Sequence, residues 1–165
     1  MIIKRVQTGE EVVRVAAMAR EIWNEHYVSI VGQEQVDYML ATFQSAEAIQ
    51  SQMESGYEYY FSLDEKGEAS GYIALIPNEP PGKMMLSKLY VRAAFRGTGV
   101  GRDLVAYAKK RAGKLGATSV WLTVNRNNLR TIEWYHRKGF VITDEVKKEI
   151  GSGFFMDDYL MEVDV

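Results

Sequence analysis

The sequence predicts a mixed α/β fold in which helices pack on a partly antiparallel sheet. The chain has 165 residues, within the usual size of one domain, and 47% of them are hydrophobic, enough to bury a substantial core. No internal repeat, low-complexity tract or long linker divides it, so we expect a single domain over residues 1–165. Strand-like and helix-like segments follow one another in the order β, helices, βββ, α, β, α, ββ.

The first third of the chain is predicted to be mainly helical. A short opening strand, IIKRV, precedes residues 10–27, where apolar side chains recur at helical spacing. Gly32 interrupts this pattern, which restarts over residues 36–43. We expect Ser45 to cap the next helix, because its hydroxyl can accept a hydrogen bond from a free helical N–H group. Gly56 ends the helical region.

The rest of the chain is predicted to supply most of the sheet. The expected elements are strands at 57–64, 70–77 and 84–91, a helix from Gly99 to Leu115 with Gly116 at its C-cap, a central strand at 118–124, a helix capped by Asn127 or Asn128 and ending at Gly139, and two strands that turn around Gly151–Gly153.

Composition excludes several classes of function. The formal net charge is −2 and the pI is near 5.8, so no basic field favours nucleic acid. The opening residues lack a signal-peptide core, and no apolar run approaches the roughly 18 residues of a membrane helix, so we expect a soluble, cytoplasmic protein. The chain has no cysteine and only two histidines, which excludes disulfides and a cysteine nucleophile and disfavours a metal site.

The segment FRGTGVGRDLVAY, residues 95–107, places three glycines at alternate positions just before a predicted helix. The first N–H groups of a helix have no helical acceptor and bind anions, and glycines without Cβ atoms let a phosphate reach the backbone. Arg96 adds a positive charge at the entrance. The alternative is a tight turn in which the glycines serve packing alone.

Two familiar phosphate loops do not fit this segment. A Walker loop requires Gly-Lys-Ser/Thr, whereas Gly101 is followed by Arg102 and Asp103. A Rossmann fingerprint requires its last glycine three residues after the second, and the following strand here ends in Val124–Asn125 without the acidic ribose ligand.

The pattern Arg96-x-x-Gly99-x-Gly101, after a strand and before a helix, resembles motif A of the GNAT superfamily, the Gcn5-related N-acetyltransferases. NRNNLRTIEWYHRKGF, residues 125–140, matches motif B of that superfamily, and LYV, residues 89–91, fits its pantetheine-binding strand. The resemblance spans essentially the whole chain. It implies a central mixed, mostly antiparallel sheet flanked by helices on both faces, and acetyl-CoA as the acyl-donor cosubstrate.

The resemblance also implies which residues bind the cofactor. Asn128, Thr131, Ile132 and Tyr135 follow helical spacing and form one face of their helix. Tyr135 would contact the sulfur of the cofactor, and Asn125 or Asn128 would hydrogen-bond the pantetheine arm; a purely structural role of Tyr135 in the core is the alternative. The cofactor-binding residues expected in this way are Leu89, Tyr90, Val91, Arg96, Gly97, Thr98, Gly99, Val100, Gly101, Arg102, Asn125, Asn128 and Tyr135.

Without a cysteine to carry the acetyl group, direct attack of an amine on the bound thioester is the simplest route. By resemblance, a backbone N–H near Tyr90–Val91 stabilises the oxyanion if that strand bulges, and Tyr135 donates a hydrogen bond to the departing sulfur. The strand before the loop has no acidic residue to serve as base. The candidates are Glu25 and His26, with Tyr27 or Tyr90 as a relay.

The acceptor is expected to be a small, cationic amine. Helices over residues 21–55 cover the acceptor pocket in this superfamily, and with the C-terminal hairpin they contribute Glu21, Glu25, Glu34, Asp37, Asp157 and Asp158. The aromatic pattern of this region resembles bacterial polyamine acetyltransferases of the PaiA type. Acetylation of protein lysines or N-termini, and a non-catalytic acyl-CoA-binding regulatory module, remain alternatives. Homodimerisation through a closing strand is left open.

Overall fold

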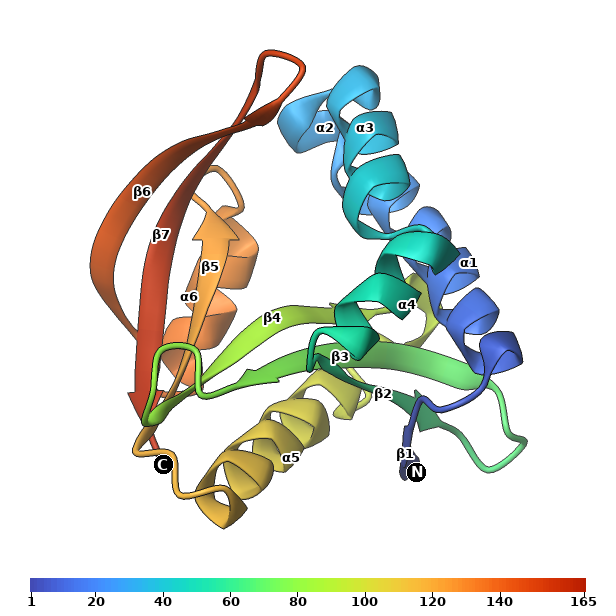
Figure 1. Ribbon diagram of the computed structural model, residues 1–165, viewed down its shortest axis with the longest axis vertical. Helices are drawn as coiled ribbons and strands as arrows, with labels where there is room; N and C mark the ends of the chain where they lie inside the picture. The colour runs from blue at the N-terminus through green and yellow to red at the C-terminus, as the bar shows by residue number, and fades with distance from the viewer.

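The computed structural model describes residues 1–165 and contains seven strands, six α-helices and one short 3-10 helix (Figure 1). In chain order they are β1 (Ile2–Arg5), α1 (Gly9–His26), α2 (Val28–Val31), α3 (Gln33–Phe43), α4 (Ala46–Glu54), β2 (Glu58–Leu63), β3 (Ala69–Pro77), β4 (Lys83–Val91), η1 (Ala93–Phe95), α5 (Val100–Lys114), β5 (Ser119–Asn125), α6 (Leu129–Arg137), β6 (Val141–Gly151) and β7 (Phe154–Asp164). The predicted order of elements is confirmed.

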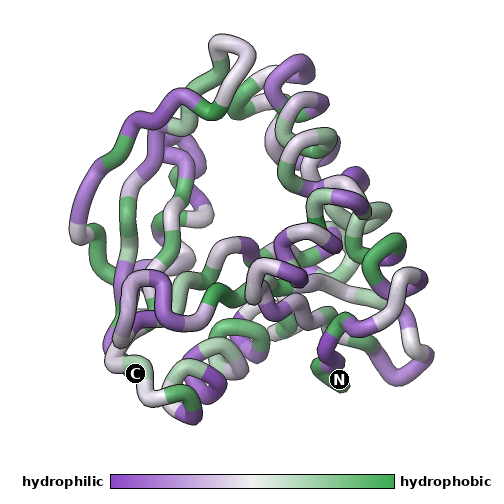
Figure 2. Tube along the Cα trace, in the orientation of Figure 1, coloured by the Kyte–Doolittle hydropathy of each residue, from purple (hydrophilic) through white to green (hydrophobic).

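The strands form one sheet in the order β1-β2-β3-β4-β5-β7-β6. Only β4 and β5 run parallel, and every other neighbouring pair is antiparallel, so the predicted mixed, mostly antiparallel sheet is confirmed. The β5 segment is central, as its apolar sequence predicts. In Figure 2 the outer strand β6 is largely hydrophilic, and all but its last two residues are exposed.

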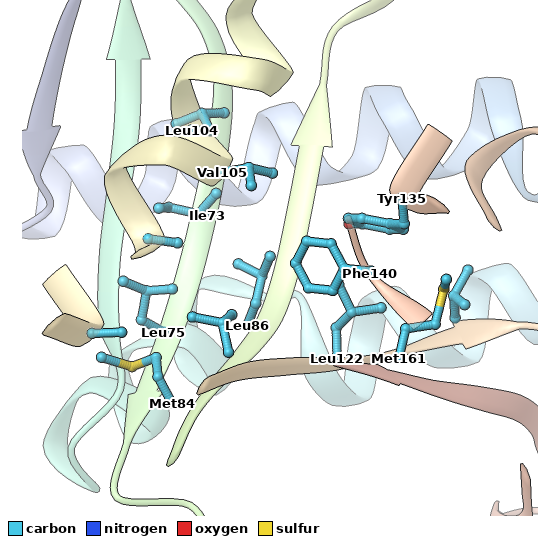
Figure 3. Packing of buried hydrophobic residues seen from close by; sticks show 14 of the residues in the cluster. Ile73, Leu75, Met84, Leu86, Leu104, Val105, Leu122, Tyr135, Phe140 and Met161 are labelled. Carbon is cyan, nitrogen blue, oxygen red and sulfur yellow. The ribbon is translucent and has the colours of Figure 1, made fainter. Parts of the chain in front are cut away.

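Helices cover both faces of the sheet and bury one hydrophobic cluster on each. Leu104, Val105 and Ala108 of α5 pack with Ile132 and Tyr135 of α6 against one face (Figure 3). On the opposite face, apolar residues of α1, α3 and α4 pack against the sheet. This second cluster comprises Val6, Val12, Val15, Met18, Ala19, Ile22, Trp23, Val36, Met39, Ile49, Tyr59, Phe61, Tyr72 and Ala74.

The helices over the second face begin at caps that the sequence specifies. Thr8 and Glu11 form a capping box: the Glu11 N–H donates to Thr8 Oγ1 at 3.2 Å, and the Thr8 N–H donates to Glu11 Oε1 at 3.0 Å. Ser45 accepts the Ala48 N–H at 3.1 Å, which confirms the predicted cap. These caps fix where α1 and α4 start, and therefore which apolar side chains turn toward the sheet.

Two helix starts in the second half differ slightly from expectation. The helix after the glycine loop begins at Val100, because Gly99 has φ 93° and is its left-handed N-cap. Asn128 occupies the N-cap of α6, as predicted, but its side chain makes no capping hydrogen bond. Its carboxamide instead lies 3.2 Å from His26 Nε2, so this residue links α6 to α1.

Candidate functional site

The glycine loop presents a run of unpaired backbone N–H groups. Gly97 has φ 76° and Gly99 has φ 93°, conformations that cost an L-residue with a side chain. The N–H groups of residues 97–102 donate to no backbone acceptor, and the first helical bond runs from Asp103 to the Gly99 carbonyl at 3.0 Å. Six consecutive N–H groups are therefore free at the positive end of α5, where a phosphate could accept hydrogen bonds from them.

The third glycine of the loop has a different role. A Cβ atom built on Gly101 would lie 3.1 Å from Trp134 of α6. Gly101 is therefore required where α5 and α6 pack closely, whereas Gly97 and Gly99 are required by their backbone angles. The packing interpretation is therefore confirmed for Gly101, whereas phosphate binding by the loop stays a prediction.

A cavity of about 640 Å³ adjoins this loop and carries a strongly positive wall. Its charged side chains are Arg96, Arg102, Arg130, Arg137 and Lys138, and no acidic residue lines it. Together with the free N–H groups, these cations suit a ligand with several phosphates. The volume lies within the range of cofactor pockets.

Strands β4 and β5 separate where this cavity reaches the sheet. Their parallel pairing covers only Lys83–Met85 and Ser119–Trp121, although β4 continues to Val91 and β5 to Asn125 (Figure 1). The Arg92 N–H donates to Ser70 of β3 at 2.9 Å. Because backbone groups alternate along a strand, the N–H groups of Leu89 and Val91 point the other way, toward the gap beside β5.

The bulge in β4 lies earlier than the conditional expectation placed it. The register with β3 shifts between Leu86 and Lys88, so the extra residue is Ser87 rather than a residue near Tyr90–Val91. The extra residue reverses the alternation of side chains. As a result, Lys88 and Tyr90 face the α1–α4 layer, while Leu89 joins the α5 side.

A second cavity, of about 230 Å³, meets the first one inside the protein. The two share a boundary formed by Tyr27, Leu89, Tyr90, Thr131 and Tyr135. The larger cavity extends from this boundary to the glycine loop, and the smaller one extends beneath helices α1, α3 and α4. A reacting atom at the boundary would be reachable from both sides.

Tyr135 lies at this boundary and is 6% exposed. Its ring centroid lies 5.2 Å from that of Trp134 and 5.2 Å from that of Phe140. Figure 3 shows Tyr135 beside Phe140. Burial raises the pKa of Tyr135 above its ordinary value of 10, so its hydroxyl remains protonated at neutral pH. The side chain therefore combines a core contact with a hydrogen-bond donor at the meeting point of the two cavities.

The two candidate bases occupy different places. His26 lines the larger cavity, where burial lowers its pKa, and its Nε2 contacts Asn128 Oδ1. Glu25 is exposed and lines neither cavity, so the structure does not bring it to the site. Tyr27 and Tyr90 both lie at the boundary, and burial raises the pKa of Tyr27 to about 12.

The remaining residues predicted to bind the cofactor also differ in which cavity they line. Leu89, Tyr90, Val91, Arg96, Gly97, Gly99, Gly101 and Arg102 all line the larger cavity. Asn125 lines the smaller one, and its Oδ1 accepts the Asn127 N–H at 2.9 Å. Thr98, Val100 and Asn128 line neither. Thr98 and Val100 contribute to the loop through their free N–H groups.

The expected acidic lining of the acceptor pocket is largely wrong. Of the six acidic residues proposed from the sequence, only Asp158 lines the smaller cavity. Glu21 pairs with Arg92 at 2.6 Å and Asp157 pairs with Arg126 at 3.0 Å, so their charges are already matched elsewhere. Glu34 is exposed, and Asp37 accepts from Gln33 at 2.8 Å.

Asp158 is 3% exposed and has no ion-pair partner. Burial, and to a smaller extent the charge of Asp157, raise the pKa of its carboxyl to about 6, although hydrogen bonding to Thr123 partly opposes this. A carboxylate in this state lacks a counter-charge, so a cationic group entering the cavity would be stabilised there.

Lys88 is the site residue that the sequence analysis missed. It lines the smaller cavity, is 7% exposed, and burial lowers its pKa to about 7. The available signal was a lysine inside the otherwise apolar strand MMLSKLYV. Periodicity alone could not locate it, since the bulge at Ser87 decides which face it takes.

No group of three or more histidine, cysteine, aspartate or glutamate side chains is placed to hold a metal ion. None of the helices has both the length and the apolar character that crossing a membrane requires.

The sequence is also similar to a known protein family. The sequence profile of the acetyltransferase (GNAT) family matches residues 16–140. An uncharacterised N-acetyltransferase of Mycobacterium tuberculosis is 34% identical over 95 residues, which cover 58% of this chain and 60% of the relative. The matched region thus spans about 60% of the length of that curated relative.

Solved structures share the fold over nearly the whole chain. The PaiA N-acetyltransferase of Thermoplasma acidophilum, in complex with coenzyme A, superposes with a TM-score of 0.79 at 23% identity and full coverage of both chains. A GCN5-related N-acetyltransferase of Rhodopseudomonas palustris gives 0.83 at 16% identity, covering 99% of this chain and 95% of the other. At these identities the likeness establishes the fold and leaves the substrate to the site itself.

Proposed function

The chain belongs to the acetyltransferase (GNAT) family, and from this membership we propose that it transfers an acetyl group from acetyl-CoA to the primary amine of a small molecule. One observation carries the proposal: a larger cavity lined by cationic side chains and a smaller, mainly apolar cavity meet at Tyr135. Such a pair of compartments allows donor and acceptor to be present together, so transfer can occur in a ternary complex.

The chain's own groups suit each part of the donor. The free N–H groups of residues 97–102 and the cations Arg96 and Arg102 would hold its diphosphate. The gap beside β4 would receive the pantetheine arm, with the Leu89 and Val91 N–H groups available to it. Bound there, acetyl-CoA supplies an acetyl group activated as a thioester.

Two kinds of hydrogen-bond donor in the protein would stabilise the charge that develops during acetyl transfer. A backbone N–H of β4 at Leu89 or Val91 would hydrogen-bond the acyl oxygen as it becomes an oxyanion. Tyr135 would donate its O–H to the sulfur as the C–S bond breaks, and its raised pKa keeps that proton in place until then. Both donors are preorganised by the sheet and by the core.

Asp158 would bind the acceptor amine and accept its proton. An alkylammonium with a pKa near that of lysine is neutral in only about one part in 2,500 at pH 7, a penalty of about 4.6 kcal/mol. The uncompensated carboxylate of Asp158 would first bind the ammonium and then accept a proton, directly or through water, as the C–N bond forms. We assign this role to Asp158 rather than to Glu25, which lies outside both cavities.

A small acceptor fits better than a peptide. The Tyr38 hydroxyl donates to the Ile150 carbonyl at 2.6 Å, and Gln35 donates to the Phe155 carbonyl at 3.0 Å. These bonds join α3 to the β6–β7 hairpin beside the smaller cavity, which Gln35 itself lines. A cavity of about 230 Å³ bridged in this way favours a compact acceptor over an extended chain.

Two measurements on the purified protein test the proposal. Calorimetric titration with CoA should detect binding, and thiol release from acetyl-CoA should accelerate when a panel of primary amines is added. Binding without amine-dependent thiol release would favour the non-catalytic acyl-CoA-binding module. No heat of binding would remove the basis of the proposal altogether. Release with lysine-containing peptides but not with free amines would favour the protein acetyltransferase instead.

A further inference from the structure

The smaller cavity carries one side chain of each charge, and its positive side chain has no acidic partner. Lys88 Nζ donates to the Phe43 carbonyl at 2.8 Å, to Gln52 Oε1 at 2.9 Å and to the Tyr59 hydroxyl. All three acceptors are neutral, and Lys88 forms no ion pair. Its hydrogen bonds are satisfied but no counter-charge faces it, and burial lowers its pKa to about 7, so a carboxylate in the cavity would favour its charged form.

The same cavity contains an unused hydrogen-bond donor. The indole of Trp23 lines the cavity and is 6% exposed, and its Nε1 has no hydrogen-bond partner. A buried N–H group without an acceptor is uncommon in folded proteins, because it loses its water without replacement. Trp23 is held by Tyr27, with ring centroids 4.2 Å apart, and by Tyr90, at 5.8 Å.

These two groups lie on the same side of the cavity. Lys88 and Tyr90 are two residues apart on one face of β4, and the Tyr90 ring packs against Trp23. Asp158 approaches instead from β7, which pairs with β5 across the gap. The cavity therefore has a negative wall on the β5–β7 side and a positive, donor-bearing wall on the β4–α1 side.

Resting on the proposed function, we propose that the acceptor is an amine carrying a carboxylate at its other end, with its ammonium at Asp158 and its carboxylate between Trp23 and Lys88. The carboxylate would supply the counter-charge that Lys88 lacks, and a small shift of the Trp23 ring, whose Nε1 is buried and unpartnered, would let it accept the Nε1–H as well. Lys88 can keep its three hydrogen bonds, since charge attraction across the cavity requires none of its protons. The volume of about 230 Å³ favours a short amino acid as acceptor.

This assignment predicts discrimination against diamines. A second ammonium would face Lys88, a like charge that the low-dielectric cavity screens poorly. Polyamines, which the aromatic pattern of the sequence suggested, would therefore be poor acceptors here. Lys88 would thus disfavour diamines and favour amino acids as acceptors.

Three acceptors with the same carbon spacing test the proposal: 5-aminopentanoate, pentylamine and 1,5-diaminopentane, supplemented by shorter and longer members of each series. Each has five carbons, and the four methylenes next to the reacting amine lead to a carboxylate, a methyl or an aminomethyl group. Thiol release should give kcat/KM in the order amino acid, alkylamine, diamine, with the amino acid exceeding the diamine by at least about tenfold. A diamine that equals or exceeds the amino acid in every series would overturn the assignment.

Two variants locate the preference. Lys88→Met should reduce the ratio of kcat/KM between amino acid and diamine by about tenfold, because it removes the positive wall. Trp23→Phe should lower kcat/KM for the amino acid more than for pentylamine, because it keeps a ring but removes the N–H. Lys110→Met, at an exposed position of α5, is the matched control and should leave the ratio at the wild-type value.

The variants also remain informative if one of them is unstable. Because Lys88 joins β4 to other elements, Lys88→Met is assayed only after thermal unfolding confirms a folded protein. If it does not fold, Trp23→Phe carries the test. Unchanged ratios in the folded variants would overturn the assignment. Calorimetric titration of the three acceptors into CoA-loaded protein reads the preference without turnover. If the three acceptors bind with affinities in the predicted order but no thiol is released, only the proposed catalysis is contradicted. If the diamine is the best acceptor in turnover, only the carboxylate assignment is contradicted.

Discussion

Replacing Asp158 with asparagine should make the protein more stable and less active. Burial raises the pKa of this carboxyl to about 6 from an ordinary value of 3.8. A difference of about two pH units corresponds to about 3 kcal/mol, the amount by which folding disfavours the ionised form above both pKa values. Asparagine has a similar shape without the charge, so Asp158→Asn should gain up to about 3 kcal/mol at pH 7.

The sign of the pH dependence follows from the same values. Between pH 3.8 and about 6 the unfolded chain has lost the proton of Asp158 while the folded protein still holds it. The folded state then binds more protons, so this group lowers the free energy of unfolding as pH rises through that window. Glu11 acts in the opposite sense at lower pH: hydrogen bonding to Lys4 lowers its pKa to about 2, so its contribution is lost as pH falls from 4.5 toward 2.

Thermal and urea unfolding of wild type and Asp158→Asn, between pH 4 and 8, measure this effect. At pH 7 the gain corresponds to a Tm increase of up to about 6–12 °C for a chain of this size. The difference between the two proteins should shrink toward zero as pH falls below 4. Acetyl transfer by the variant should fall by about a hundredfold or more, since the amine loses its carboxylate.

A neighbouring substitution is the matched control. Asp157 is paired with Arg126 at 3.0 Å and lies outside the cavity, so Asp157→Asn should lose up to about 1 kcal/mol from this pair. Because the Asp157 charge also raises the pKa of Asp158, its removal offsets part of that loss, and the net change should stay well below the gain of Asp158→Asn. The reasoning would be refuted if Asp158→Asn were no more stable than wild type at pH 7, or if its advantage persisted unchanged at pH 4.

Three further outcomes are expected. Tyr135→Phe should lower kcat about tenfold or more but leave the calorimetric Kd for CoA within about twofold of the wild-type value, because only the hydrogen bond to sulfur is removed. An unchanged kcat would exclude Tyr135 from the chemistry. Gly97→Ala and Gly116→Ala should each lower the free energy of unfolding in urea by about 1–2 kcal/mol, since both glycines have positive φ and open space around them. Only Gly97→Ala should also weaken CoA binding. Equal Kd values for the two variants would contradict the loop assignment. The double variant Arg96→Gln/Arg102→Gln should raise the Kd for CoA and flatten its dependence on salt concentration, whereas a salt dependence equal to that of wild type would show that these cations do not face the phosphates.

The sequence alone determined the features that depend on local patterns. Helical periodicity, the Ser45 cap and the glycines at 97 and 99 act over a few residues, so the order of elements and the position of the loop could be predicted. The motif residues around Arg96 and Tyr135 resemble a family for the same reason: their spacing is preserved in the chain itself.

Only the tertiary structure decided which charges the acceptor cavity contains. Six acidic residues appeared equivalent in the sequence, but ion pairs with Arg92 and Arg126 occupy Glu21 and Asp157, and burial leaves Asp158 without a partner. The bulge at Ser87 likewise turns Lys88 toward the cavity, and close packing against Trp134 explains Gly101. Each of these outcomes depends on which distant residues come into contact and which side chains lose water, and no short-range pattern encodes that.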